Sequence, residues 1–205
     1  MTSWQKLRDE TAQCTRCDLY RRATQTVFGE GRTGVSNTLV GEQPGDQEDK
    51  QGHPFVGPAG RILDRALDEA GIDRDDVYVT NAVKHFKWTE RGKRRIHQRP
   101  NGTEIRACGF WLEAELGAVG PQLVVLLGAV AGEAMFGSRY RVGVHKGKAE
   151  EASLGSWQGL VVGTIHPSAV LRGPDPEDSE SRDRAYAGLV ADLVAAREAA
   201  AETAR

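Results

Sequence analysis

The sequence predicts an α/β fold with three layers, α/β/α, around a central, mostly parallel, four-stranded sheet. Short β-branched, apolar runs alternate with amphipathic helical patterns, which is typical of parallel sheets covered by helices. The run Leu123–Leu127 is apolar without interruption, as expected for a central strand covered on both faces. A chain of 205 residues can bury a substantial core, so we expect residues 1–205 to form a single domain.

The first half of the chain is expected to supply two strands and their helices. A helix begins near residue 3 and leads into a Cys-x-x-Cys pair within residues 3–22. The first strand covers Asn37–Val40 and the second covers Val77–Ala82. Between them, the sequence RILDRALDEAG predicts a helix with one apolar face, and Gly71 is expected to cap its carboxyl end.

The second half is expected to supply two more strands. A basic loop, residues 84–101, precedes a helix that begins near Asn101, because Asn101 and Glu104 have the spacing of a capping box. The third strand is Leu123–Leu127 and a short helix follows it. The fourth strand covers residues 160–165, and a last helix covers residues 178–199. The alanine-rich tail, residues 195–205, is expected to fray.

Polar motifs stand at the expected ends of three strands. They are Gly41-Glu42-Gln43, Asn81 and His166-Pro167-Ser168. Parallel α/β sheets bind ligands outside the carboxyl ends of their strands, so these motifs are expected to meet on one rim. The first motif opens residues 41–60, a long polar loop rich in glycine and proline, and loops of this length are usually functional.

Positive charge is concentrated on one segment of a chain whose net charge is only −2. Residues 84–99 contain seven lysines or arginines and one acid, which suits an anionic partner, although a solvated loop would explain the pattern equally well. No apolar run approaches the ~18–20 residues needed to span a bilayer, and the amino terminus lacks the apolar centre of a signal peptide. We therefore expect a cytoplasmic protein without membrane contact.

Three cysteines, an odd number, argue against a disulfide framework. Cys14 and Cys17 form half of a tetrahedral metal site, Cys108 is a candidate third ligand, and His85 or His97 could be the fourth. The ligand types alone favour zinc over an iron–sulfur cluster. Two simpler explanations stay open: Cys14 and Cys17 as a redox pair, and Cys108 as a buried apolar side chain.

Four segments, GEQPGDQED, GHPFVGPAGRILD, VYVTNAVKH and HPSAVLR, in this order and spacing resemble the uracil-DNA glycosylase superfamily, most closely its iron–sulfur branch, family 4. The resemblance covers residues 14 to about 195. It implies a 4Fe–4S cluster held by Cys14, Cys17 and Cys108, with His85 where that branch has its remaining cysteine. This departure and the KRRIH segment, residues 93–97, resemble the UdgX subgroup, whose members excise uracil and then stay covalently joined to the DNA.

The resemblance implies a pocket for one extruded base, since a base inside a duplex cannot be reached. Phe55 would stack on the uracil beside Gly41 and Ser168, and the Asn81 amide would pair with its O4 and N3–H. A core Phe55 and a turn-forming Asn81 are the simpler explanations.

The resemblance also assigns the chemistry of the pocket. His166 would stabilise the departing uracil anion, and Glu42 would stabilise the sugar cation or orient a water. His166 could instead be a turn residue. Gln43 stands next to Glu42, where relatives carry alanine or a catalytic aspartate, and an amide cannot act as a base.

A second loop is expected to decide what captures the sugar. The bland interpretation is that Lys93, Arg94 and Arg95 bind phosphate. The sharper one is that His97, the histidine of KRRIH, attacks the sugar C1′ in place of water. Leu171 and Arg172 match the region that fills the space left by the flipped base, unless Leu171 is simply buried.

Three hypotheses therefore stand at the level of sequence. The first is a monomeric uracil-DNA glycosylase, preferring single-stranded DNA, that traps its own product at His97. The second is an ordinary glycosylase that turns over and uses its basic loop only to grip phosphate. The third is a zinc-bearing module that binds nucleic acid and performs no chemistry.

Overall fold

The structure is a computed structural model and describes residues 3–172 and 179–203. Its centre is a five-stranded sheet in the order β2-β1-β5-β7-β6. The strands are β1 (Asn37–Gly41), β2 (Val77–Asn81), β5 (Leu123–Leu127), β7 (Trp157–Thr164) and β6 (Ala149–Leu154). The first four are mutually parallel and β6 is antiparallel to β7, so the sheet is mixed but mostly parallel, as expected.

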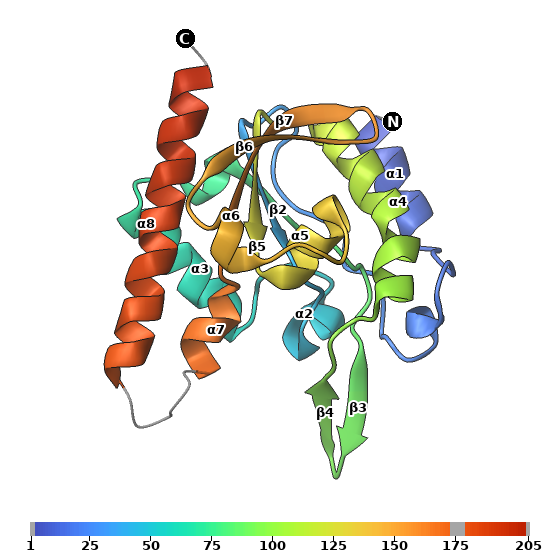
Figure 1. The fold of residues 1–205 in the computed structure, drawn as a ribbon. Coiled ribbons are helices and arrows are strands. Elements are labelled where there is room, and N and C mark those ends of the chain that lie inside the picture. The colour runs from blue at the N-terminus through green and yellow to red at the C-terminus, as the bar shows by residue number, and fades with distance from the viewer. Residues whose placement is uncertain (1–2, 173–178, 204–205) are drawn as a thin grey trace.

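Helices cover both faces of this sheet (Figure 1). One face carries α3 (Pro58–Glu69) and α8 (Ser179–Thr203), whose apolar side chains share one buried cluster with β1, β2, β5 and β7. The other face carries α4 (Gly102–Val119) and α5 (Ala129–Phe136), with α1 (Ser3–Thr11) outside α4. The predicted three-layer arrangement is confirmed. None of the helices in the described part of the chain is both long and apolar enough to cross a membrane.

Several elements were not expected from the sequence. The basic loop contains a two-stranded hairpin, β3 (Trp88–Arg91) with β4 (Arg94–His97), which projects from the body in Figure 1. Strand β6 and the short helices α2 (Asp46–Gln51), α6 (Val142–His145) and α7 (Pro167–Arg172) are also additional, as are the 3-10 turns Asp18–Arg21 and Arg74–Asp76. The main sheet thus has five strands where the sequence analysis expected four.

The alanine-rich tail, residues 195–205, is helical as far as the structure describes it, and the expected fraying stays a prediction. Helix α8 continues to Thr203, and Ala196 and Ala200 are buried against the sheet. Alanine has the highest helix propensity, and its small side chain lets the helix lie close to its neighbours. The expected amino-terminal start of α4 is confirmed, because Asn101 and Glu104 form a capping box.

A polar network is buried between β2 and α4. Lys84 and Glu115 form an ion pair, and neither side chain is exposed. Lys84 Nζ also donates to Thr80 Oγ1 and to the backbone oxygen of Asn81, both at 2.7 Å. Glu115 Oε1 accepts a hydrogen bond of 2.6 Å from the Tyr78 hydroxyl. A buried charge is tolerated only when it is paired and hydrogen-bonded, and here both charges are. The network fixes the backbone at the carboxyl end of β2.

Candidate active site

A pocket of about 440 Å³ opens at the carboxyl edge of the sheet. Seven of the residues that the sequence singled out line it: Gln43, Phe55, Asn81, His97, His166, Ser168 and Leu171. They come from the ends of β1 and β2, from the loop before α3, from the β3–β4 hairpin, and from the segment after β7 that continues into α7. The expected convergence of three polar motifs on one rim is therefore confirmed.

Gly41 allows the floor of the pocket to close. It pairs with Asn81 in the register of β1 and β2, so the two residues lie side by side at the ends of their strands. A Cβ atom on Gly41 would lie 2.6 Å from Cζ of Phe55, which no real side chain allows. Glycine at this position is what lets Asn81 and Phe55 approach each other, consistent with the expected place of Gly41 beside the base.

Phe55 is held in a conformation that bulky residues avoid. Its φ is +58°, and among the described residues it is the non-glycine residue with positive φ. Glu48, which is buried, accepts a 2.7 Å hydrogen bond from the backbone of Gly57 and so fixes the loop from inside. The Phe55 ring lies 6.2 Å from the His166 ring, with 26° between their planes. Strain of this kind persists where the surroundings hold a side chain in place for a function.

Ser168 sets the protonation of His166. The backbone N–H of Ser168 lies 3.1 Å from His166 Nδ1, and its hydroxyl lies 2.8 Å from the same nitrogen. A backbone N–H can only donate, so Nδ1 must be the acceptor, and in the neutral ring the proton is on Nε2. His166 therefore offers an N–H donor from its other nitrogen. Ser168, which was expected to bind substrate, lines the pocket, and its hydroxyl contacts His166 and so helps to orient this histidine.

Glu42 and His97 meet at the edge of the pocket. Glu42 directly follows β1, and its Oε1 lies 3.4 Å from Nε2 of His97, the last residue of β4. The side chains of Glu42 and His97 are 23% and 43% exposed, although Oε1 of Glu42 is itself covered. Residues 55 positions apart thus bring a carboxylate and an imidazole to one point, as the sequence hypothesis requires.

Gln43 holds the base of the hairpin. Its Nε2 donates to the backbone oxygens of Lys87, at 3.2 Å, and Gln98, at 3.0 Å, and its Oε1 accepts from the Lys87 N–H at 3.1 Å. Lys87 and Gln98 flank the hairpin and are joined by a 2.9 Å hydrogen bond of their own. The Gln43 amide thus holds the segment that carries His97, and the expectation that Gln43, next to Glu42, also belongs to the catalytic residues stays a prediction.

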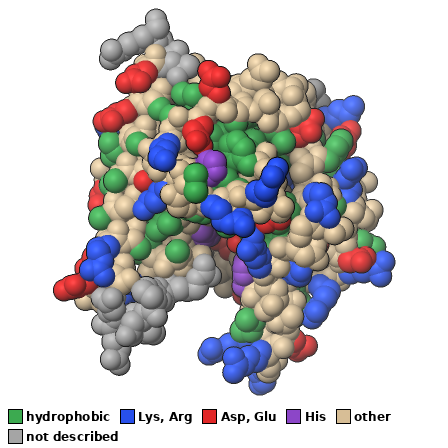
Figure 2. All heavy atoms as spheres, in the orientation of Figure 1, with side chains coloured by type: hydrophobic (Ala, Val, Ile, Leu, Met, Phe, Trp, Pro, Cys, Tyr) green, Lys and Arg blue, Asp and Glu red, His purple; other side chains and the backbone are tan. Residues whose placement is uncertain are grey.

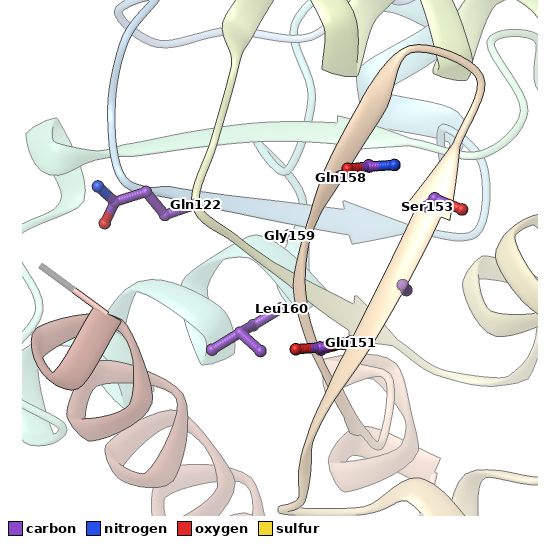
Figure 3. Close-up of a pocket in the computed structure, with 7 residues that line it drawn as sticks. Gln122, Glu151, Ser153, Gln158, Gly159 and Leu160 are labelled. Atoms are coloured by element: carbon purple, nitrogen blue, oxygen red, sulfur yellow. The ribbon is translucent and has the colours of Figure 1, made fainter.

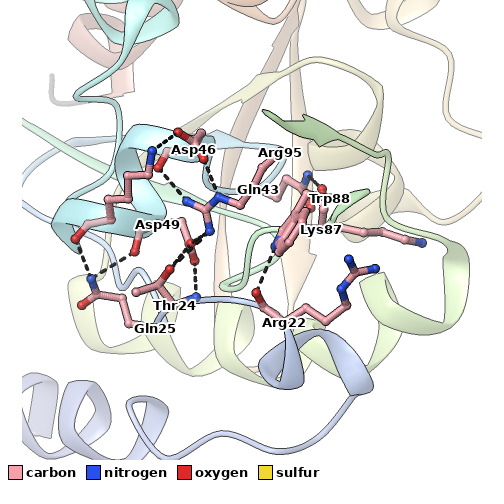
Figure 4. Close-up of polar contacts among 10 residues, drawn as sticks. Arg22, Thr24, Gln25, Gln43, Asp46, Asp49, Lys87, Trp88 and Arg95 are labelled. Carbon is pink, nitrogen blue, oxygen red and sulfur yellow. Dashed lines mark hydrogen bonds and ion pairs between the residues drawn. The ribbon is translucent and has the colours of Figure 1, made fainter. Parts of the chain in front are cut away.

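Arg95 does not point toward solvent as a phosphate ligand would. Its guanidinium forms ion pairs of 2.6 Å with Asp46 and Asp49 of α2, and its side chain is only 19% exposed (Figure 4). Although burial alone would lower it, hydrogen bonds to Asp49 and Asp46 raise the pKa of Arg95. Arg95 is thus a second anchor for the hairpin, and its expected contact with phosphate stays a prediction. In the sequence, Arg95 has no feature that distinguishes it from the neighbouring Lys93 and Arg94.

The other expected DNA contacts stand apart from this anchor. Lys93 and Arg94 are exposed near the tip of the hairpin, where Figure 2 shows basic side chains gathered. Leu171 on α7 is 46% exposed and lines the pocket, so it is not the buried helix-end leucine that was the alternative. The side chain of Arg172 lies outside the described residues. The contact of Lys93, Arg94 and Leu171 with DNA stays a prediction.

The three cysteines share one region. Cys14 and Cys108 belong to one buried cluster, and Cys17 packs against it. Trp111 Nε1 lies 3.0 Å from Cys14 Sγ, and the backbone N–H of Lys84 lies 3.2 Å from Cys108 Sγ. Burial raises the pKa of Cys108 to about 12, so a thiolate there needs compensating positive charge. In the described part of the chain, no three His, Cys, Asp or Glu side chains are grouped so as to hold a single metal ion.

His85 follows Lys84 and is buried, with its pKa lowered by that burial. A neutral imidazole can act as a metal ligand, and the residue before it already contacts Cys108. Three thiols and an imidazole are a suitable donor set for an iron–sulfur cluster. The residues therefore fit such a group.

A second hollow, of about 630 Å³, lies at the amino-terminal ends of β5 and β7 (Figure 3). Its lining includes Gln122, which precedes β5, and Glu151, Ser153 and Gln158 from β6 and β7. It contains one carboxylate and no histidine or cysteine. The two histidines and the Asn81 amide that the sequence singled out therefore line the smaller pocket, at the carboxyl edge of the sheet.

Comparison with known proteins gives consistent relatives. A family model described as the uracil DNA glycosylase superfamily matches residues 28–190. The chain is 36% identical over 174 residues to a type-4 uracil-DNA glycosylase from Pyrobaculum aerophilum, covering 83% of this chain and 85% of that protein. It is 37% identical over 171 residues to one from Thermotoga maritima, covering 82% and 83%. A third, from Archaeoglobus fulgidus, is 33% identical over 178 residues, covering 85% and 86%.

The region matched by the family model contains every strand of the main sheet and every residue that lines the pocket. The shared region is thus the part of the molecule that carries the candidate site. The chain belongs to the uracil DNA glycosylase superfamily and is related to its type-4 enzymes.

Proposed function

We propose that this protein is a uracil-DNA glycosylase that becomes covalently joined to its product through His97. The observation that carries the proposal is the approach of His97 Nε2 to within 3.4 Å of Glu42 Oε1, beside a pocket lined by Phe55, Asn81 and His166. A catalytic carboxylate and a nucleophilic nitrogen then face the same reacting carbon.

The pocket is suited to one flipped uracil. Phe55 supplies a ring for stacking, and the Asn81 amide supplies one donor and one acceptor, which complement uracil O4 and N3–H. Cytosine presents the opposite pattern at these positions and would leave the buried amide unpaired. The buried position of Asn81, held through its backbone by Lys84, supports this role.

Excision breaks the bond between C1′ and N1 of uracil, and the electron pair leaves with the base. His166 carries its proton on Nε2 when neutral, so it can donate to uracil O2 as negative charge develops there. Glu42 faces the sugar and stabilises the positive charge left on C1′. No strong base is needed for this step, which agrees with an amide at Gln43.

Trapping follows when the lone pair of His97 Nε2 forms a bond to C1′. The imidazole then loses its Nδ1 proton to solvent, and the uracil anion takes one up. The imidazole is a poor leaving group, so water does not displace it from C1′ and each enzyme molecule acts once. The support is the rigid position of His97: Gln43 and Arg95 anchor its hairpin at the base and along β4.

The test is a denaturing gel after mixing the protein with single-stranded DNA that contains one uracil. We expect a shifted protein–DNA band, equimolar with the protein, that disappears in His97→Ser while uracil is still released. Lys93→Ser in the same hairpin is the matched control and should keep the band. Free abasic product in excess over the protein would replace this proposal by a glycosylase that turns over. DNA binding without any uracil release would leave only a binding module.

We propose further that Cys14, Cys17, Cys108 and His85 hold a 4Fe–4S cluster. Such a cluster would supply the positive charge that buried thiolates require and would link the amino-terminal segment to α4. We expect about four iron atoms per chain and absorbance near ~400 nm in the purified protein. Cys108→Ser should lower both, and Met135→Leu, which changes a neighbour of the same apolar cluster, should not. A colourless protein loaded with zinc would contradict the assignment.

A further inference from the structure

Three aromatic rings are stacked beside the pocket, on the segment that contains α5 and α6. The rings of Phe136 and Tyr140 are 5.7 Å apart with 4° between their planes. The rings of Tyr140 and His145 are 4.6 Å apart at 14°, and those of Phe136 and His145 are 5.5 Å apart at 11°. Phe136 is 38% exposed, whereas Tyr140 is 5% exposed. The group therefore presents one ring to solvent on a rigid base.

The base of this stack is fixed from several sides. The Tyr140 ring lies against Gly132 of α5, where any Cβ would overlap with it, and its hydroxyl lies against Gly163 of β7. The His145 ring is held by Glu150 Oε2, 2.5 Å from Nδ1. A ring on such a support loses little conformational freedom when a ligand stacks on it, which favours binding.

The segment around the stack is basic. Residues 129–148 contain Arg139, Arg141, Lys146 and Lys148 and the one acid Glu133, whereas Glu150 and Asp192 pair with His145 and Lys146. Arg139 and Arg141 are exposed beside Phe136 in the sequence. The Arg141 guanidinium is pre-oriented, because its Nη1 donates to the backbone oxygens of Ser138, at 3.0 Å, and Tyr140, at 2.9 Å. Figure 2 shows lysine and arginine side chains across the middle of this face and at the hairpin.

Helix α5 connects the stack to the pocket. Helix α5 begins after Gly128, whose position lies against His166: a Cβ there would be 3.0 Å from the His166 Cβ. At the other side, Arg99, just after the hairpin, forms a 3.0 Å ion pair with Glu133 of α5. An eight-residue helix spans about 12 Å, which is roughly three to four nucleotides at a stacked spacing of about 3.4 Å.

We propose that Phe136 is a stacking platform for a base a few nucleotides away from the uracil, and that Arg139 and Arg141 contact the phosphates beside it. An exposed ring flanked by arginines is the combination that binds single-stranded nucleic acid without sequence preference. The partner is the single strand on one side of the pocket. This inference rests on the proposed function in one respect: the proposed function supplies the uracil in the bound strand, whereas the stacking and phosphate contacts do not depend on it.

The test measures the affinity of the full chain for a fluorescent, uracil-free single strand of about 20 nucleotides, by anisotropy. Stacking is worth about 1–3 kcal/mol per base, so Phe136→Ala should weaken binding roughly 5- to 150-fold. Phe136→Leu should behave like Phe136→Ala, and Phe136→Trp should keep the affinity. Phe110→Ala is the matched control, because Phe110 is 49% exposed on α4 and lies over Arg16.

A double variant, Arg139→Gln with Arg141→Gln, should reduce the slope of log affinity against log salt by about 1.4, two phosphates at about 0.7 each. Wild-type affinity in Phe136→Ala or Phe136→Leu would overturn the stacking role, and an unchanged slope would overturn the phosphate contacts. Because the strand lacks uracil, neither result depends on excision or trapping. Uracil release by Phe136→Ala from a strand of three nucleotides should match the wild type.

Discussion

Replacing Lys84 with methionine is expected to lower the free energy of unfolding by about 3–5 kcal/mol. The change leaves the Glu115 carboxylate buried without its partner, and it removes the Nζ hydrogen bonds to Thr80 and to the Asn81 backbone. For a chain of this size, about 2–4 °C of Tm per kcal/mol corresponds to a loss of roughly 6–20 °C. Thermal unfolding followed by circular dichroism measures it.

Two further variants make this expectation specific. Lys148→Met removes an exposed lysine and should change Tm by little. Combining Lys84→Met with Glu115→Leu removes both charges and should recover much of the loss, since an apolar replacement of a buried pair is often neutral. A Tm for Lys84→Met within the scatter of the wild type would show that the pair is not what holds this end of β2.

Glu42→Gln is expected to slow uracil excision by about 100-fold or more while DNA affinity changes little. The amide keeps the size of the carboxylate but cannot stabilise positive charge on the sugar. Single-turnover release of uracil measures the first quantity, and anisotropy with uracil-free single-stranded DNA measures the second.

The control for this substitution is Glu90→Gln, which removes an exposed carboxylate from the basic hairpin and should leave excision unchanged. If Glu42→Gln lowered affinity and excision by similar factors, Glu42 would be a structural residue that shapes the pocket. A large loss of excision with normal affinity separates chemistry from binding.

The layers of the fold could be read from periodicity because apolar strands and one-sided helices leave strong local patterns. Strand β6, AEEASL, could not: it is an edge strand whose residues alternate between exposed and half-buried, so little apolar side chain marks it. Its place depends on pairing with β7, which is a tertiary contact.

The hairpin did leave one local signal. Arg91 pairs with Arg94, which makes Gly92 and Lys93 a two-residue turn, and Gly92 has φ +60°. Glycine at the first turn position is typical of tight hairpins, but the charged strands around it hid the pattern. What Gln43 and Arg95 contact, 44 to 55 residues away, is decided by the folded arrangement. Sequence reasoning therefore found the pocket's members but not the contacts by which Gln43 and Arg95 anchor the hairpin.

The closure of the chain beneath the hairpin makes the hairpin separable from the scaffold. Lys87 and Gln98 are hydrogen-bonded to each other, so the two ends of the segment Trp88–His97 meet at one place. The segment is an insert in the architectural sense, and none of the strands of the main sheet runs through it. Under the proposed function, deletion of this one segment would remove the capturing His97 and leave the scaffold in place, which would turn a self-consuming enzyme into a recycling one.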